Sequence, residues 1–135
     1  MTNNESRRTN NAKIVKFTDL RAWQLAHGLA VNIYKTTRNF PPEEQFALTN
    51  QIRRAAVSVT SNIAEGFSRS TSDDKKRFYS IALGSLTEIQ SQLLIAKDVG
   101  LMDEKAFQSL ADESVEVHKV LNGLRLSTVK GVKNA

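Results

Sequence analysis

The sequence predicts an all-α protein, folded as an up-down-up-down bundle of four antiparallel helices. Apolar residues recur at helical spacing in four successive segments of the 135-residue chain. No segment shows a sustained period-two alternation or an Asn-Gly or Asp-Gly hairpin turn, the usual signs of strands. The three connections between the segments are only a few residues long, and short connections place successive helices side by side in opposite directions.

The folded part is expected to begin near Phe17, and its first helical segment is expected to end at Phe40. Asp19 is a candidate N-cap, and Pro41 and Pro42 cannot continue a helix. Its apolar residues cover about two thirds of a helical wheel, which is wider than one buried stripe. They are Leu20, Trp23, Leu25, Ala26, Leu29, Ala30, Val31, Ile33 and Tyr34. We therefore expect this helix either to be central or to be buried in part against another subunit.

The second helix is expected to begin at Pro42, because proline is favoured at the first helical position and the acidic pair at 43–44 complements the positive end of the helix dipole. Gly66 is the expected C-terminal cap. The inward positions follow one helical face: Ile52, Ala56, Val59 and Ile63. The segment QIRRAAVSVTSNIAEGF, residues 51–67, is thus predicted to be helical, which argues against a catalytic loop.

The third helix is expected to start at a Ser-Thr-Ser cap at 70–72, followed by acids at 73–74, and to continue to Gly100. Its inner stripe is predicted to contain Phe78, Ala82, Leu86, Ile89, Leu93, Ala96 and Val99. The fourth helix is expected to begin at Asp103 and to fade after Leu126. It places Phe107, Leu110, Val117, Leu121 and Leu124 inward.

Positive charge is concentrated at the two ends of the chain. Residues 1–16 carry four basic residues and one acid, and residues 118–135 carry four basic residues and no acid. The two ends together therefore have a net charge of +7, which exceeds the net charge of +5 of the whole chain. The remainder is therefore at −2. We expect a bundle at residues 17–126 between disordered basic tails at 1–16 and 127–135, because the tails have too few apolar residues to offset the entropy of ordering.

The composition limits the compartment and the chemistry. Cysteine is absent, which excludes disulfides, thiolate zinc sites and cysteine nucleophiles. No apolar run approaches the roughly 20 residues that span a bilayer, and the N-terminal segment lacks the apolar stretch of a secretory signal. We therefore expect a cytoplasmic protein that does not bind membranes.

No pattern of catalytic or metal-binding residues stands out. His27 and His118 have no Glu or His at the spacing of a helical metal site, and the sequence contains no Glu-x-x-His pair, no Gly-x-Ser-x-Gly elbow and no phosphate-binding Gly-rich loop. Catalysis would have to use dispersed carboxylates such as Glu65 or Glu88. We predict no metal, no cofactor and no enzymatic activity.

Six basic residues are candidates for nucleic-acid contacts: Arg53, Arg54, Arg69, Lys75, Lys76 and Arg77. Consecutive helical residues point about 100° apart, so the two adjacent arginines cannot serve the same face. One interpretation is an ion pair or a carbonyl contact at a helix or subunit boundary. The other is a phosphate contact, in which the remaining four residues extend a basic strip. The aromatic side chains of Trp23, Tyr34 and Phe78 fit the apolar stripes and are predicted to be core residues rather than a platform for bases.

Two stretches, QIRRAAVSVTSNIAEG and GSLTEIQSQL, resemble the bacterial four-helix-bundle proteins encoded within intervening sequences of large-subunit ribosomal RNA genes, and the resemblance covers residues 17–126. It implies an antiparallel bundle that assembles as a ring-like homo-oligomer, most often a pentamer. It also implies a more distant similarity to the accessory protein of diversity-generating retroelements, which works with a reverse transcriptase and binds nucleic acid through basic residues outside such a ring. No established activity comes with the intervening-sequence family.

Two functional hypotheses follow. The first is a non-enzymatic oligomeric module that binds structured RNA or DNA through electrostatic contacts to the backbone. The alternative is a protein–protein scaffold or adaptor with no nucleic-acid role, whose charges serve solubility. Assembly would favour the first, because five copies would carry about +25 and turn a modest basic strip into a continuous band.

Overall fold

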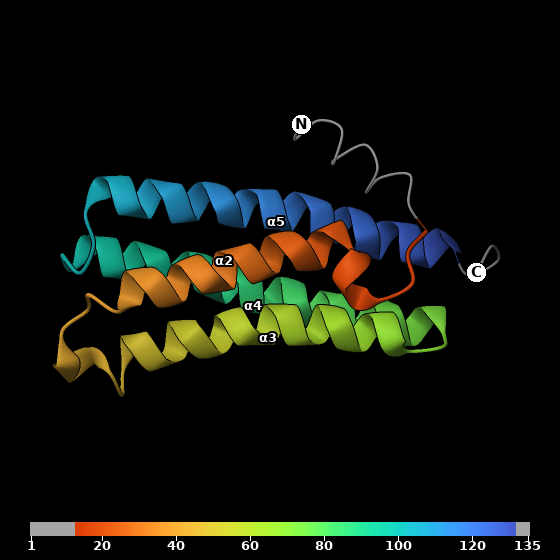
Figure 1. The fold of residues 1–135 in the computed structure, drawn as a ribbon, viewed down its shortest axis with the longest axis horizontal. Helices are drawn as coiled ribbons and strands as arrows, with labels where there is room; N and C mark the ends of the chain where they lie inside the picture. Colours follow the sequence, from red (N-terminus) through yellow and green to blue (C-terminus); the bar gives the residue numbers. More distant parts are fainter. Residues whose placement is uncertain (1–12, 132–135) are drawn as a thin grey trace.

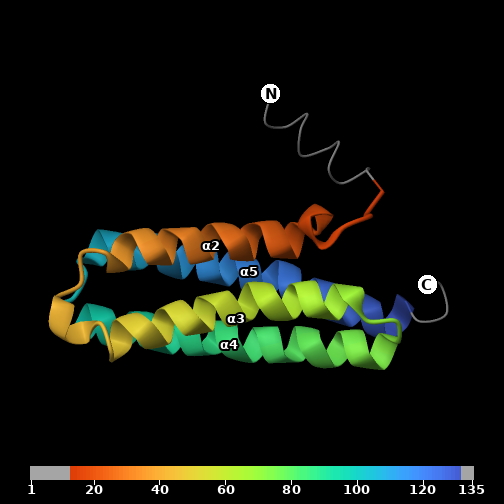
Figure 2. The same cartoon turned by 60° about the horizontal axis from the view of Figure 1, so that its bottom comes forward.

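The computed structural model describes residues 13–131, with side chains to residue 128, and within this range it is all-helical (Figure 1). Four long helices follow one another: α2 (Arg21–Thr37), α3 (Leu48–Ser68), α4 (Ser72–Asp98) and α5 (Glu104–Gly131). Two 3-10 turns, η1 (Phe17–Asp19) and η2 (Pro42–Glu44), precede α2 and α3. The described residues contain no strand. The sequence colours in Figures 1 and 2 reverse direction along the long axis from each helix to the next.

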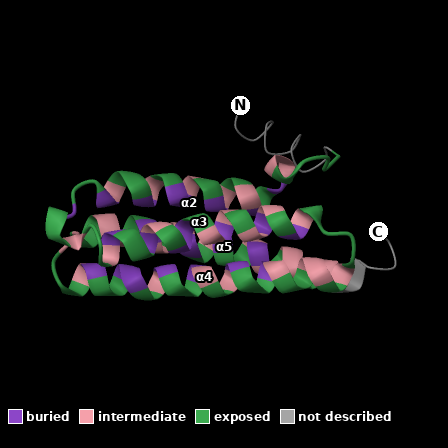
Figure 3. Ribbon diagram, turned by 90° about the horizontal axis from the view of Figure 1, so that it is seen from below, coloured by how far each residue is buried: buried purple, intermediate pink, exposed green. Residues whose placement is uncertain are grey.

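One hydrophobic core runs between the four helices. Figure 3 shows its residues as buried positions that recur along each helix, with exposed positions between them. The predicted inward positions of α3 are confirmed, since none is more than 1 % exposed: Ile52, Ala56, Val59 and Ile63. The helix α3 packs most extensively on α4, and α2 lies against α3 and α5.

The ends of α2 differ from the prediction. Asp19 was the expected N-cap, but Leu20 occupies that position and the helix ends at Thr37 rather than Phe40. The carboxylate of Asp19 instead accepts hydrogen bonds from the backbone amides of Lys16 and Val15, each at 2.9 Å. These hydrogen bonds stabilise the charged form and lower the pKa of Asp19. The Asp19 carboxylate therefore binds the amides of the preceding turn and does not cap α2.

Both predicted ends of α3 are also wrong. Pro42 begins the short turn η2, and α3 starts six residues later, at Leu48. Gly66 is not a cap, because the helix continues to Ser68. The physical reason for glycine here is close packing against α4: a Cβ at this position would lie 2.7 Å from Cε1 of Tyr79 and 2.9 Å from its Cδ1.

The beginning of α4 is confirmed and its inner stripe is confirmed in part. Thr71 is the N-cap, and its hydroxyl accepts a hydrogen bond from the Asp74 amide at 3.1 Å. Five predicted stripe residues are fully buried: Ala82, Leu86, Ile89, Leu93 and Ala96. Tyr79, rather than the half-buried Phe78, lies in the core, and Val99 is 63 % exposed because the helix ends before it at Asp98.

The last helix is longer than predicted. Asp103 accepts a hydrogen bond from the Ala106 amide at 2.8 Å, as an N-terminal cap does, and α5 then continues to Gly131, past the expected fade at Leu126. Part of the expected C-terminal tail is therefore helical. The segments 1–12 and 132–135 of the expected tails lie outside the described residues. None of the described helices is long and apolar enough to cross a membrane.

Candidate nucleic-acid interface

The six candidate residues do not form one strip. Arg53 and Arg54 lie in the N-terminal half of α3, whereas the other four, from Arg69 to Arg77, surround the connection between α3 and α4. Sixteen residues of helix separate the first candidate from Arg69, and at 1.5 Å per residue this is roughly 24 Å along the bundle. Each group therefore has to be judged by its own surroundings.

Arg53 is half-buried and contacts the neighbouring helix. Its Nε donates a hydrogen bond to Oγ1 of Thr37 at 2.8 Å, and its Nη2 donates to the backbone carbonyl of Tyr34 at 3.3 Å. The guanidinium carbon also lies 4.6 Å from the centre of the Tyr34 ring. These contacts tie the last turn of α2 to α3, as the carbonyl-contact interpretation predicted. Arg54 is exposed, and its side chain has no hydrogen bond or ion pair to any described residue.

Lys75 is also engaged within the bundle. Its Nζ donates to the backbone carbonyl of Phe67 at 2.7 Å and lies 3.4 Å from that of Gly66. Both carbonyls belong to the last turn of α3, and that of Gly66 also accepts from the Arg69 amide at 3.2 Å, so the ammonium adds a cap contributed by the next helix. Burial of the amine lowers the pKa of Lys75. The position of this cation is explained by helix capping alone.

Arg69 and Arg77 converge on one aromatic ring. Their guanidinium carbons lie 4.7 and 4.6 Å from the centre of the Phe78 ring. Each also pairs with a nearby carboxylate: Arg69 with Glu65 at 2.6 Å, and Arg77 with Asp74 at 3.7 Å. These pairs are exposed and offset much of the local positive charge. Lys76 is exposed, with no polar partner among the described residues, so two of the six candidates have unengaged charges.

Charge is divided unevenly between the two halves of the bundle. Residues 20–68, which include α2 and α3, carry five basic residues and three acids, a net charge of +2. Residues 72–131, which include α4 and α5, carry eight basic residues and nine acids, a net charge of −1. Sequence reasoning missed two members of the positive half, Lys35 and Arg38. The complete absence of acids between residues 20 and 42 is the sequence feature that could have revealed both residues.

A shallow groove of about 310 Å³ follows the outer boundary between α2 and α3. Its lining consists of His27, Ala30, Val31, Tyr34, Lys35, Arg38, Val57 and Thr60, and includes no acid. Three of these side chains are unusually exposed for their apolar character: Val31 at 37 %, Tyr34 at 39 % and Val57 at 44 %. The prediction that Tyr34 belongs to the core is therefore wrong.

Aromatic rings extend from one end of this groove. The Trp23 and His27 rings stack with their centres 4.7 Å apart and a 16° angle between their planes. Phe17 meets the indole of Trp23 edge-on at 5.3 Å. Trp23 is half-buried, so the predicted core position is only partly correct. Along α2, positions 23, 27, 31 and 34 repeat at helical spacing and form one line.

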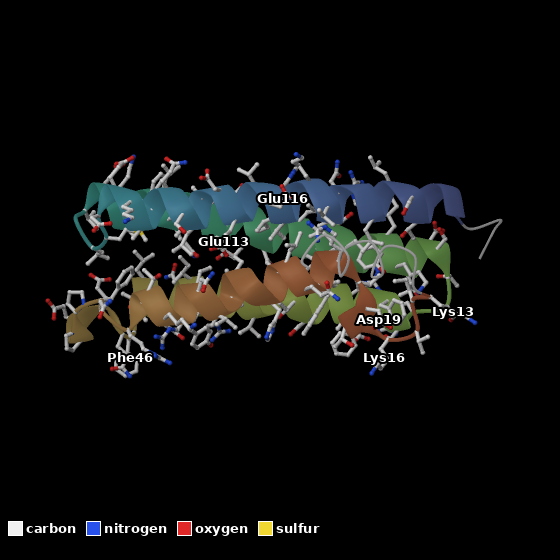
Figure 4. All side chains as sticks on the ribbon, turned by 45° about the horizontal axis from the view of Figure 1, so that its top comes forward. Lys13, Lys16, Asp19, Phe46, Glu113 and Glu116 are labelled. Carbon is white, nitrogen blue, oxygen red and sulfur yellow. The ribbon has the colours of Figure 1, made fainter. Side chains whose placement is uncertain are left out.

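The opposite side of α2 has a different character. Glu113 of α5 points toward α2, and both of its carboxylate oxygens accept from Nδ2 of Asn32, at 3.1 and 2.9 Å (Figure 4). This acid is thus engaged on the α5 side, away from the groove. In the described part of the chain, no group of three or more His, Asp or Glu side chains is placed to hold a metal ion.

Comparison with known proteins agrees with the resemblance noted in the sequence. The family model described as "23S rRNA-intervening sequence protein" matches residues 18–123. A crystal structure from Bacteroides thetaiotaomicron, described as a protein with unknown function from the S23 ribosomal protein family, superposes with a TM-score of 0.70. The two chains are 23 % identical, and the match covers 77 % of this chain and 97 % of the other. That similarity supports the fold. No curated protein matches this chain.

Proposed function

The chain belongs to the 23S rRNA-intervening sequence protein family, and from that premise we propose that it is a non-enzymatic module that binds structured RNA or DNA through phosphate contacts. The binding unit is a homo-oligomer of up-down-up-down bundles, with a pentameric ring as the preferred form. The observation that carries the proposal is the separation of charge between the α2–α3 half of the bundle, at +2, and the α4–α5 half, at −1.

The contact surface is the outer side of α2 and α3. Arg38, Lys35 and Arg54 contribute charges that are exposed, α2 contains no acid, and the one acid of α3, Glu65, pairs with Arg69 at the far end of the helix. Phosphate groups are attracted to such a surface and repelled by the acid-rich half, which orients the bundle on the nucleic acid. Backbone contacts of this kind carry no sequence information, so sequence preference should be weak.

Assembly strengthens the contact without any new residue. Five copies carry about five times the net charge of +5 given by the sequence, or about +25. Repetition of the α2–α3 surface allows several phosphates to be contacted together, and each displaced counterion makes the affinity more dependent on salt. For B-form DNA, the slope of log affinity against log salt is about −0.9 for every neutralised phosphate.

The test is fluorescence anisotropy of a labelled RNA hairpin and a labelled DNA duplex, titrated at several salt concentrations on protein whose mass is fixed by light scattering. The double variant Arg38→Gln, Arg54→Gln should weaken binding at least tenfold and flatten the salt slope. The control Lys105→Gln, Lys119→Gln removes the same charge from α5 and should change the affinity less than threefold. Arg53 is unsuitable for this test because its loss also removes the contacts between α2 and α3.

Equal effects of the two double variants would show that only net charge matters and would overturn the assigned surface. Absence of binding to RNA and DNA at low salt would overturn the function itself.

The second candidate function is the protein–protein scaffold, and one exposed side chain favours it. Phe46 is 88 % exposed beside η2, at the end of the bundle opposite Lys13 and Lys16 (Figure 4). A large exposed ring beside a helix–helix connection is a typical anchor for a protein partner. Under this function, the wild-type protein would capture a protein partner and would bind neither RNA nor DNA at low salt. Phe46→Ser would abolish capture of the partner.

A further inference from the structure

We propose that the groove between α2 and α3 receives an unpaired base of a single-stranded segment in the bound nucleic acid. This inference rests on the proposed function and goes beyond it, because backbone electrostatics alone do not distinguish paired from unpaired strands. It assigns a position to the base in the groove and to the adjoining phosphates on its rim.

The floor and walls of the groove are suited to the faces of a base. Val31 and Val57 expose apolar surface from the two helices, and Tyr34, which is 39 % exposed, lines the groove with them. A volume of about 310 Å³ lies at the lower end of the range for small-ligand sites. Base stacking on an aromatic side chain tolerates any sequence, because every base has a π-face.

The Tyr34 ring is held in place from within the bundle. The guanidinium of Arg53 lies over the ring and donates to the carbonyl of the same residue, while its Nε is fixed on Thr37. A ring that is already ordered loses little conformational freedom when a base packs on it. The structural role of Arg53 therefore supports the groove, although this residue is not proposed to touch phosphate.

The rim supplies positive charge on both helices. Lys35 and Arg38 line the groove from α2, and Arg54 lies three residues before Val57 on α3, which places it one turn away on the neighbouring surface. No acid lines the groove. An apolar recess with a cationic rim complements a nucleotide, which has an apolar face and an anionic phosphate.

Pairing decides which nucleic acids can use the site. Bases inside a duplex are stacked on both faces and cannot present a face to a protein groove, whereas loops, bulges and single strands can turn a base outward. A duplex would meet only the rim. The groove therefore predicts a preference for unpaired strands over duplexes of the same charge.

The experiment compares a 12-nucleotide oligouridine RNA with a 12-base-pair RNA duplex, both labelled and measured by anisotropy at one salt concentration. Val57→Ser places a hydroxyl in the groove and should weaken single-strand binding about tenfold, as loss of one base contact does, with less than a threefold effect on the duplex. The matched control is Val115→Ser, a change of the same exposed residue type on α5, which should affect neither. Tyr34→Leu should reproduce the Val57→Ser result.

A second signal reports occupancy directly. Trp23 is the only tryptophan of the chain, and its ring stacks on His27, which lines the groove. Saturation with oligouridine should change the intrinsic tryptophan emission of the wild-type protein. At an oligouridine concentration that saturates the wild type but not Val57→Ser, the variant should show little of this change.

Three outcomes would overturn this inference. One is equal affinity of Val57→Ser and Val115→Ser for the single strand. Another is unchanged Trp23 emission at saturation. The third is a lower mass of Val57→Ser alone in light scattering, which would show that a second copy of the chain covers the groove. If the duplex binds through Arg54 while groove variants have no effect, the proposed function stands and this inference fails; if no nucleic acid binds, both fail.

Discussion

The close approach of α3 to α4 at Gly66 makes Gly66→Ala an informative test of the packing. The new Cβ would lie 2.7 Å from Cε1 and 2.9 Å from Cδ1 of Tyr79, and 3.2 Å from Cβ of Phe78. Contacts shorter than 3.0 Å require some atoms to move. Tyr79 is only 2 % exposed, so its ring cannot swing into solvent and must displace core neighbours instead.

Two opposing effects set the size of the change. Replacing glycine by alanine within a helix gains up to about 1 kcal/mol in propensity. Forcing an extra carbon into a well-packed core costs about 1–3 kcal/mol. Because the Tyr79 ring is buried and cannot move aside, we expect the cost to lie in the upper part of this range, at about 2–3 kcal/mol, and the free energy of unfolding to fall by about 1–2 kcal/mol for Gly66→Ala. Gly84→Ala is the matched control in α4, where a Cβ would have no atom within 4 Å, and it should stabilise the protein by about 0.5–1 kcal/mol.

Urea unfolding followed by circular dichroism measures both variants. A double variant tests whether the Tyr79 ring is the cause. In a Tyr79→Leu background, which removes the ring, the loss of stability caused by Gly66→Ala should shrink toward zero. A Gly66→Ala protein as stable as the wild type, or a penalty that persists without the ring, would refute the account of close packing at this position.

Three further predictions concern contacts at other positions. Arg53→Ala should lower the free energy of unfolding by about 1–2 kcal/mol, because hydrogen bonds and a cation–π contact are lost, whereas Arg54→Ala should change it by less than about 0.5 kcal/mol in the same urea assay. Thr71→Ala should destabilise the protein by about 1 kcal/mol through loss of the α4 cap, whereas the control Thr87→Ala, in the middle of the same helix, should not. Equal losses of stability for the two variants in thermal unfolding would contradict the role of the cap. Burial raises the pKa of Tyr79 to about 12, against about 10 when unfolded, so its neutral phenol favours folding below pH 10 and this contribution is lost as the pH rises from 10 to 12. Tyr79→Phe should therefore move alkaline unfolding to higher pH, and an unchanged midpoint would contradict the assignment.

The helical core was predictable from periodicity, whereas the helix ends were not. Ile52 and Ile63 fall on one face of any helix drawn through the segment, and burial follows from that face. Gly66 has the composition of a cap, but the ring that explains it is contributed by another helix. Asp19 has the composition of an N-cap, but a preceding turn binds its carboxylate. Ends depend on competing local contacts, which a single periodic pattern does not encode.

The candidate site was likewise predictable only in part, because contacts between helices are not visible in the pattern of one helix. A helical wheel separates Arg53 from Arg54 by about 100°, but it does not reveal which one lies against the neighbouring helix. Lys75 acts on carbonyls across a helix connection, which no spacing within its own helix indicates. Lys35 and Arg38 could have been found, because the acid-free stretch at residues 20–42 is visible in the sequence.

The wide apolar surface of α2 constrains how the chain can assemble. The helix is not central, since it packs on α3 and α5 and leaves Val31 and Tyr34 exposed beside the groove. A neighbouring subunit seated on the groove would bury the cations of Lys35 and Arg38 and would have to neutralise them with its own acids. The phosphates in the proposed complex need the same two cations. The two uses of this surface exclude each other, so a ring that binds nucleic acid here must close through other surfaces.

Another apolar surface is available on the opposite pair of helices. Ile81 and Ile95 are 14 residues apart on α4, close to four whole turns, so they lie on one outer face of the helix. Val99 follows directly after the end of the helix, and all three residues are exposed. The half of the bundle that includes this face has a net charge of −1, so it attracts phosphate less than the α2–α3 half does. Subunit contacts through α4 would remove apolar area from water and leave the α2–α3 groove open. In the proposed complex, the α4–α5 half would therefore serve assembly and the α2–α3 half would bind nucleic acid.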